Sequence, residues 1–295
     1  MKLERCPLCG SNDYQKIYHG IRKYSRIRID VKNEVDTSIG VLKCRQCGLV
    51  RLSNTPDNVD EFFRRSGMRD SKPTDAEESR RANDDQSRRY FLQTEEWISG
   101  REVVDFGCGC GGYLCYAREK AKRAVGVEIE DAMRSQLIES GFECVSSIDS
   151  IGKVDVITLF HVLSHFEDPL QKIASLKQHL KPGGILYIET PNIDDALLSL
   201  YHSKAFEVHA FHRDMLLYWS KPTLELLAEK SGLSVDSIRF IQRYPLANHL
   251  YWLSNEKPGG HVKWDYLGSE ELNREYGKVL ADLGKTDTII CILRN

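Results

Sequence analysis

The chain has 295 residues, of which 41% are hydrophobic and 28% charged, so we expect most of it to fold around apolar cores. Its net charge is −2, from 41 basic and 43 acidic side chains, which excludes a general electrostatic attraction to nucleic acid or to an anionic membrane. No apolar run has the length of a signal core or a membrane span, so we expect a cytoplasmic protein without membrane insertion.

Two C-x-x-C-G motifs near the N-terminus predict a metal site. The first contains Cys6 and Cys9, and the second contains Cys44 and Cys47. Two residues between thiols let one tight turn direct both sulfurs to one ion, and two such turns make a tetrahedral four-thiolate zinc site. Segments 15–18, 25–29 and 40–43 have β character, so residues 1–52 are expected to form a zinc ribbon. Four filled ligand positions favour a structural metal over redox pairs or surface disulfides.

Residues 53–99 are polar and are predicted to form a helical linker or cap. The segment 76–98 carries aromatic side chains at helical spacing, which can pack against the next domain. Its arginines bracket aspartates, and this pattern fits a solvated helix face with i,i+4 pairs. A clamp for a phosphorylated substrate is the alternative.

The run VVDFGCGCGG at 103–112 is the strongest signal for a bound nucleoside. A short apolar strand ends in a glycine-rich turn, a helix-forming stretch follows, and a second apolar segment ends in the acid Glu128. A doubly wound α/β domain binds a nucleoside with this order of elements. The motif D-x-G-x-G-x-G consists of Asp105, Gly107, Gly109 and Gly111. An acid ahead of the glycines would repel a pyrophosphate and suits a ligand with an amino group and a sulfonium. A strand–helix turn without a ligand is the alternative.

Strands and helices are expected to alternate after the glycine run. The segments expected as strands are 142–145, 154–160, 185–192, 235–243 and 286–293. The segment 154–160 is largely apolar, as buried parallel strands are, and it leads into His161 and His165. An insert at 244–284 is dense in aromatic and hydrogen-bonding side chains. It is either the wall of an acceptor site or a satellite hydrophobic cluster.

The glycine motif, Glu128 and the segment LKPGGILYIETPN resemble the class I S-adenosylmethionine-dependent methyltransferases. This resemblance implies a seven-stranded, doubly wound, Rossmann-like sheet over residues 100–295, with S-adenosylmethionine as cofactor. The glycine loop would hold the methionine part and Glu128 the ribose, and Asp149 would accept from the adenine amino group. The residues expected to bind the cofactor are Asp105, Gly107, Gly109, Gly111, Glu128, Ile129, Asp149 and Phe160.

A methyltransferase that acts on a hydroxyl must also remove a proton, for which a histidine is well suited. The candidates are His161, His165 and His212. Related enzymes often carry a histidine a few residues before an aromatic–serine pair, but Met215 occupies about that place here, so the identity of the base stays open. We expect the acceptor between the 161–165 segment and the region 209–252.

A zinc ribbon ahead of this fold resembles the sugar C-methyltransferases, and surface-polysaccharide assembly is a pathway in which such an enzyme would act. The first hypothesis is therefore methylation of a saccharide or a nucleotide-activated sugar. Those enzymes carry a longer C-terminal domain, whose absence here favours O-methylation. A quinone or lipid-like acceptor is one alternative. Another is an RNA methyltransferase that reads nucleic acid with the ribbon, which the charge balance disfavours, as the intact cofactor motifs disfavour a silent scaffold.

Overall fold

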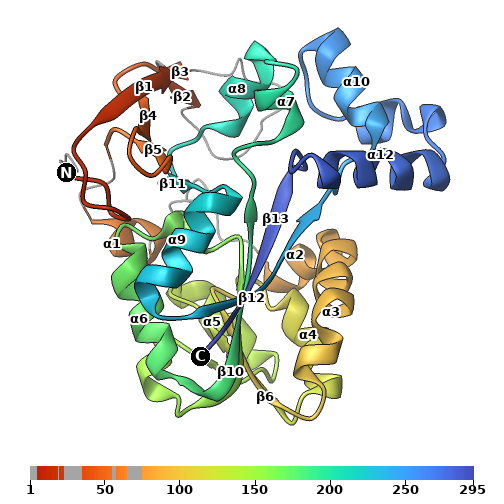
Figure 1. The fold of residues 1–295 in the computed structure, drawn as a ribbon. Coiled ribbons are helices and arrows are strands. Elements are labelled where there is room, and N and C mark those ends of the chain that lie inside the picture. The colour runs from red at the N-terminus through yellow and green to blue at the C-terminus, as the bar shows by residue number, and fades with distance from the viewer. Residues whose placement is uncertain (1–4, 19, 23–34, 55–57, 65–74) are drawn as a thin grey trace. The chain divides into compact units, whose positions relative to one another are not determined.

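The computed structural model contains a seven-stranded mixed sheet with the strand order β12-β13-β10-β9-β6-β7-β8 (Figure 1). Its strands are β6 (Glu102–Phe106), β7 (Arg123–Val127), β8 (Cys144–Val145), β9 (Val154–Phe160), β10 (Leu180–Pro191), β12 (Ser234–Ile241) and β13 (Thr288–Arg294). The structure describes residues 5–18, 20–22, 35–54, 58–64 and 75–295. The sheet confirms the predicted doubly wound α/β fold.

Strand β6 is the centre of the parallel part of this sheet. It pairs in parallel with β7 and with β9, and β7 pairs in parallel with β8. Val103 and Val104 of β6 and Val156 and Ile157 of β9 are all buried, as near-continuous apolar sequence in a parallel strand requires. Because these strands run in the same direction, the segments that follow them start at the same edge of the sheet, where doubly wound folds bind ligands.

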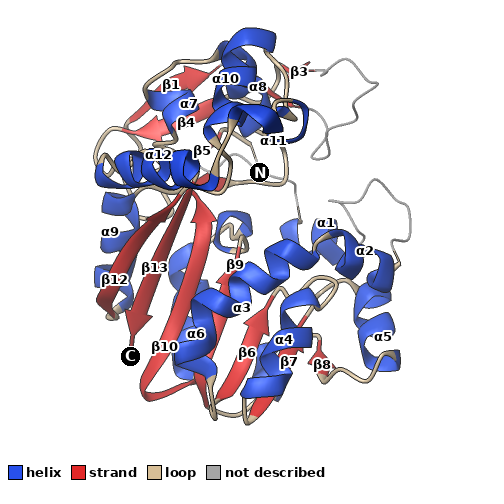
Figure 2. Cartoon of the chain, turned by 90° about the vertical axis from the view of Figure 1, so that its right-hand side faces the viewer, coloured by secondary structure: helices blue, strands red, loops and turns tan. Residues whose placement is uncertain are grey.

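Three helices precede β6, and helices alternate with the strands that follow it. They are α1 (Val59–Arg64), α2 (Ala76–Ala82), α3 (Asp84–Ile98), α4 (Gly112–Lys120), α5 (Asp131–Glu139), α6 (Pro169–Gln178) and the short η1 (Ile148–Ser150) and η2 (Leu163–His165). Asp168 caps the N-terminus of α6 by accepting from the backbone N–H of Gln171, and Pro169 is in the first turn of the helix. Helices α3 and α4 lie side by side (Figures 1 and 2), and the hydroxyls of Thr94 and Tyr113 are 3.0 Å apart.

The chain divides into two compact units, each built from separate stretches. We call Met1–Thr55, Glu189–Leu227 and Ser237–Cys291 the ribbon unit, and Pro56–Ile188, Ala228–Asp236 and Ile292–Asn295 the glycine-loop unit. The sequence-based division into 1–52, 53–99 and 100–295 stays a prediction. Residues 65–74 of the predicted linker lie outside the described residues.

A small antiparallel sheet in the ribbon unit has the strand order β1-β4-β5-β11. Its strands are β1 (Tyr14–Tyr18), β4 (Val41–Cys44), β5 (Val50–Leu52) and β11 (Leu217–Tyr218), and β2 (Ile21–Arg22) pairs separately with β3 (Val35–Asp36). The segments expected at 15–18 and 40–43 are close to β1 and β4, whereas that at 25–29 lies outside the described residues. Strand β11 comes from far along the chain and completes a sheet that begins at the N-terminus.

The predicted insert at 244–284 is helical. It contains α10 (Leu246–Asn255), α11 (Gly260–Lys263), η3 (Asp265–Leu267) and α12 (Glu270–Asp282). The preceding part of the chain adds α7 (Ala196–Ser199), α8 (Lys204–Ala210) and α9 (Lys221–Ser231). Among the described residues, no helix has both the length and the apolar character needed to cross a membrane. The cytoplasmic location stays a prediction.

Candidate cofactor and acceptor sites

The glycine loop between β6 and α4 is held by the end of β7. The backbone N–H groups of Gly107 and Cys108 donate to the carbonyl of Val127 at 2.7 and 3.1 Å. Gly107 has φ 76°, and a Cβ there would lie 2.6 Å from Val162 Cγ2. Gly109 has φ 54°, but a Cβ there would meet nothing within 4 Å. Gly107 therefore permits the turn and the close packing, while Gly109 leaves open space beside the backbone.

Asp105 is a buried carboxyl at the start of this loop. It is 2% exposed, and its Oδ1 accepts from the Thr158 hydroxyl at 2.8 Å. Burial raises the pKa of Asp105 to about 7, the Thr158 hydrogen bond opposes this shift, and the nearby Glu128 carboxylate adds to it. A cationic ligand group beside Asp105 would stabilise its ionised form.

Glu128 connects the end of β7 to the glycine loop. Its Oε2 accepts from the Gly109 N–H at 2.8 Å, and its Oε1 accepts from the Glu130 N–H at 2.8 Å. These bonds fix the direction of the carboxylate. A carboxylate offers about four acceptor positions, so this arrangement is also compatible with accepting the two hydroxyls of a ribose.

The other three residues predicted to bind the cofactor, Ile129, Asp149 and Phe160, lie in different surroundings. Ile129 is half-buried. The Asp149 side chain is 79% exposed, accepts from the Ser147 hydroxyl at 2.7 Å and lies 3.6 Å from His179 Nε2. Phe160 stacks on Tyr90 with ring centroids 4.0 Å apart. Aromatic packing explains the position of Phe160, and cofactor contact by these three residues stays a prediction.

Two of the predicted catalytic histidines follow β9. His161 has φ 59°, a left-handed conformation that is strained for a residue with a Cβ and that recurs at functional sites. The His165 ring lies 4.9 Å from the Phe63 ring, between centroids. Both histidines are half-buried at the carboxyl end of a parallel strand. Their catalytic roles stay predictions.

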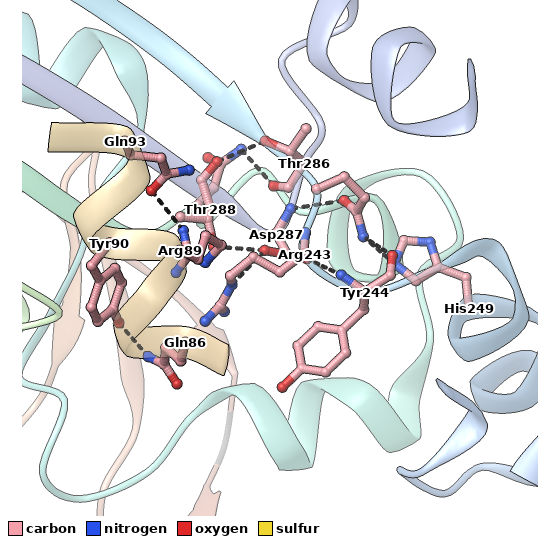
Figure 3. A network of polar contacts seen from close by, with 12 residues as sticks. Gln86, Arg89, Tyr90, Gln93, Arg243, Tyr244, His249, Thr286, Asp287 and Thr288 are labelled. Carbon is pink, nitrogen blue, oxygen red and sulfur yellow. Dashed lines mark hydrogen bonds and ion pairs between the residues drawn. The ribbon is translucent and has the colours of Figure 1, made fainter. Parts of the chain in front are cut away.

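The arginines of α2 and α3 have several kinds of partner. Arg80 Nη1 donates to the carbonyl of Cys110 in the glycine loop at 3.0 Å, and its guanidinium lies 5.5 Å from the centre of the Phe142 ring. Arg89 Nη1 donates to Gln93 at 3.0 Å, one turn along α3 (Figure 3). The exposed i,i+4 ion pair of Arg81 with Glu77 is of the expected kind, whereas Arg80 bonds the glycine loop.

The four predicted metal ligands of the ribbon unit come together. The Sγ atoms of Cys6, Cys9, Cys44 and Cys47 all lie within 4.8 Å of one another. The Cys6–Cys47 and Cys9–Cys44 separations are 3.6 and 3.5 Å. In a tetrahedral zinc site with bonds of about 2.3 Å, neighbouring sulfurs are about 3.8 Å apart. The donor set and its spacing therefore fit a tetrahedral metal ion, as the paired motifs predict.

A cavity of about 300 Å³ lies within the ribbon unit. Its aromatic lining includes Phe206, Tyr218, Tyr244 and Trp252. Its polar lining includes Asn192, Asp195, His209, His212, Arg243, Asn248, His249, His261 and Asp287. Several of these come from the insert, so the insert forms part of a cavity wall. The mixture of flat apolar faces and hydrogen-bonding groups suits a small cyclic molecule.

His212 lines this cavity and is oriented by a buried carboxylate. Its Nδ1 lies 2.5 Å from Asp214 Oδ1, and the two side chains are 17% and 3% exposed. A carboxylate at Nδ1 selects the tautomer with the proton on that nitrogen, which leaves Nε2 as the basic atom. The sequence analysis named His212 and missed Asp214, although the spacing H-x-D was a signal for the pair.

Asp287 and Arg243 form a hydrogen-bonded ion pair in the cavity wall (Figure 3). Asp287 Oδ1 accepts from Arg243 Nε at 2.9 Å and from the Thr288 hydroxyl at 2.6 Å. Its Oδ2 accepts from the backbone N–H groups of Arg243 and Tyr244 at 2.8 and 3.1 Å. Burial acts to lower the pKa of Arg243, but the Asp287 carboxylate outweighs it, so the pKa is raised and the guanidinium stays charged.

Asp195 and His249 are titratable groups in the same wall. Asp195 Oδ1 caps α7 by accepting from the Leu197 N–H at 2.7 Å. Burial raises the pKa of Asp195 to about 7, and the neighbouring Asp287 carboxylate adds to the shift. Burial lowers the pKa of His249 to about 4, so this ring is neutral and holds the Tyr276 hydroxyl at 2.7 Å. Neither residue was singled out for this role from the sequence.

The sheet and the glycine loop define a class I S-adenosylmethionine-dependent methyltransferase. Residues 75–238, more than half of the chain, match the family model described as "Methyltransferase domain". The chain belongs to this family, which confirms the predicted enzyme class.

Known proteins agree with this assignment. The chain is 32% identical over 118 residues to the "Ubiquinone biosynthesis O-methyltransferase" of Methylococcus capsulatus, which covers 36% of this chain and 49% of that protein. It is 35% identical over 120 residues to the protein of the same name from Actinobacillus pleuropneumoniae, covering 35% and 51%. The chain thus spans about half the length of the curated relatives it matches. The solved structure of a SAM dependent methyltransferase from Archaeoglobus fulgidus shares the fold, with a TM-score of 0.51, 21% identity and coverage of 73% of this chain and 94% of that one.

Proposed function

We propose that the glycine-loop unit binds S-adenosylmethionine as methyl donor, and that the cavity of the ribbon unit binds the acceptor, a small molecule with a hydroxyl group. The buried Asp105, the open backbone at Gly109 and the fixed carboxylate of Glu128 support the cofactor assignment. Asp105 would stabilise the cationic methionine part, and Glu128 would accept from the ribose. When bound, the sulfonium supplies an electrophilic methyl group, so the protein has to align the acceptor and remove its proton.

The main support for an acceptor site in this cavity is the His212–Asp214 pair in its wall. We propose that His212 Nε2 takes the proton of the acceptor hydroxyl, while Asp214 stabilises the imidazolium that forms. A positioned histidine contributes roughly 10²–10⁴-fold to such a step. His161 and His165 are the alternative bases.

Two acceptor classes share the required chemistry of a ring that carries a hydroxyl. The name of the matched relatives favours a phenol or quinol-type ring, as in the quinone alternative of the sequence analysis, and the aromatic lining of the cavity suits its flat faces. The many amide, imidazole and carboxylate groups of the same lining favour the second candidate, a saccharide or nucleotide sugar. The relatives' names give no support to polysaccharide biosynthesis.

An acceptor panel separates the two classes. The full chain is incubated with labelled S-adenosylmethionine and either catechols and quinols or nucleotide sugars, and methylated products are identified by mass spectrometry. Methyl ethers of phenols are the expected products, whereas methylated sugars would establish the second candidate. Transfer to a nitrogen or carbon atom alone would reject O-methylation.

The proposed base is tested in the same assay. His212→Ala should lower turnover by roughly 10²–10⁴-fold and leave cofactor affinity, measured by calorimetry, unchanged. His202→Asn is the matched control, because His202 is an exposed histidine whose Nδ1 bonds only the backbone carbonyl of Leu198 among the described residues. Near-normal turnover of His212→Ala would reject this base and direct attention to His161 and His165.

We further propose that the four cysteines hold one structural zinc ion. The sulfur separations and the repeated turn support this, since Gly10 and Gly48 each donate a backbone N–H to the first cysteine's carbonyl at 2.9 Å. Elemental analysis of untagged protein should find about one equivalent of zinc. Absence of zinc from protein purified without chelator would contradict the assignment.

A further inference from the structure

We infer that the four-cysteine ribbon supports the catalytic loop of this enzyme, with Tyr218 as the positioning residue that connects the ribbon to His212. The inference rests on the proposed role of His212 as the base. It gives the metal site a function in acceptor chemistry, beyond the stability of the N-terminal segment.

A ladder of paired strands connects the metal ligands to Tyr218. Cys44 is the last residue of β4, and its N–H donates to the Leu49 carbonyl at 2.9 Å. Strand β4 pairs with β5, and β5 pairs with β11 so that Val50 lies opposite Tyr218. A backbone ladder therefore runs from a metal ligand to Tyr218 through β5.

This strand ladder packs on an apolar core. Phe211, Met215 and Tyr218, on both sides of His212 in the sequence, are buried in one cluster with residues of β4 and β5. The rings of Phe211 and Tyr218 meet edge to face, with centroids 5.1 Å apart. The ring of Tyr18, the last residue of β1, lies 5.6 Å from that of Phe211. The residues that flank His212 are thus packed into the ribbon core.

Tyr218 is also hydrogen-bonded directly to the backbone of His212. The His212 N–H donates to the Tyr218 hydroxyl at 3.2 Å, and that hydroxyl donates to the His212 carbonyl at 3.4 Å. Asp214 holds the ring of the same residue through Nδ1. Tyr218 therefore fixes the backbone of His212, and Asp214 fixes its imidazole.

This arrangement predicts that loss of the metal lowers turnover and leaves cofactor binding intact. Loss of the metal would release β4 and β5, then β11, and with it the backbone of His212. A displacement of about 1 Å at a catalytic group can lower a rate about 10²-fold. The cofactor residues belong to the glycine-loop unit, which has its own apolar cluster around Leu114 and Leu137, so cofactor affinity should persist.

The variant Tyr218→Phe tests the connection, because it keeps the buried ring and removes the hydroxyl. We expect turnover to fall about tenfold, cofactor affinity to stay within twofold, and the His212 ring signals to move in NMR spectra of the full chain. Tyr266→Phe is the control, since Tyr266 is an exposed tyrosine of the same unit that lies outside the strand ladder and its apolar core. Thermal melting establishes that both variants are folded.

Removal of the metal from the wild-type chain with a chelator is the second measurement. The His212 signals should shift together with the loss of metal, while calorimetry still detects cofactor binding. Unchanged His212 signals and turnover in Tyr218→Phe and after chelation, alongside an inactive His212→Ala, would overturn the inference and leave the proposed function intact. An active His212→Ala would overturn the base assignment itself, and the inference with it.

Discussion

The glycine loop and the acceptor cavity are built in different ways. The cofactor residues proposed here follow one another between Asp105 and Phe160 and are held by short backbone bonds, such as Gly107 N–H to the Val127 carbonyl. The cavity residues come from 191 to 287 and depend on strands near the N-terminus. In this proposal, cofactor recognition is local in the sequence, whereas acceptor recognition depends on tertiary structure.

Loss of the metal site should have the largest effect, and this effect should be on turnover and not on cofactor affinity. The double variant Cys6→Ser/Cys44→Ser should contain no zinc and should lose about 10²-fold in turnover, because the backbone of His212 loses its support. Cofactor affinity measured by calorimetry should change little. The matched control is Cys115→Ser, which alters a half-buried cysteine of α4 outside the cluster. Equal losses in cofactor binding and turnover in the double variant would contradict the separation.

A smaller effect is expected from substitution of Glu128, and here the loss should be in cofactor affinity. Glu128→Ala removes charge-assisted hydrogen bonds to the ribose, worth about 1.5–3 kcal/mol, so cofactor affinity should fall roughly tenfold or more. The variant also removes the acceptor of the Gly109 N–H, so the melting temperature should decrease. Glu128→Gln keeps one acceptor oxygen and should lose less. Calorimetry showing wild-type cofactor affinity in Glu128→Ala would reject the ribose assignment.

The smallest effect is a pH dependence of cofactor binding set by Asp105. Its pKa is raised to about 7 by burial, so the carboxyl becomes protonated as the pH falls through that value. A cationic ligand favours the ionised form, so affinity should fall about fourfold between pH 8 and pH 6.5. The folded state binds the proton more tightly than the unfolded chain, so Asp105 lowers stability as the pH rises from about 4 to about 7.

Asp105→Asn serves as the test of this origin. It should flatten the affinity profile across the same range, weaken cofactor binding at pH 8, and raise the melting temperature there because no buried charge remains. A profile that keeps its slope in Asp105→Asn would assign the titration to another group.

Local patterns account for most of what could be predicted from the sequence. The strand–glycine–helix–strand order of β6 to β7 is written in consecutive residues, and so are the two cysteine motifs. The sheet and the four-cysteine cluster were therefore predictable. His161, His165 and His212 could be named as candidate bases from the residue type alone, and their catalytic roles stay predictions.

The rest of the cavity depends on contacts between distant residues. Arg243 and Asp287 are 44 positions apart, and their pairing leaves no periodic pattern. Strand β11 has only two residues, too few for the alternation that identifies a strand. Tyr218 lies in this strand, and helix α9 begins only at Lys221. Partners of this kind become visible only after the chain has folded.

The late arrival of β11 in the ribbon sheet has a consequence for the order of synthesis. A ribosome completes β1, β4 and β5 long before Leu217 and Tyr218 emerge, so β5 presents an open backbone edge in the meantime. An unpaired strand edge is a template for pairing with another chain. A nascent or truncated polypeptide that stops before Leu217 should therefore aggregate through β5.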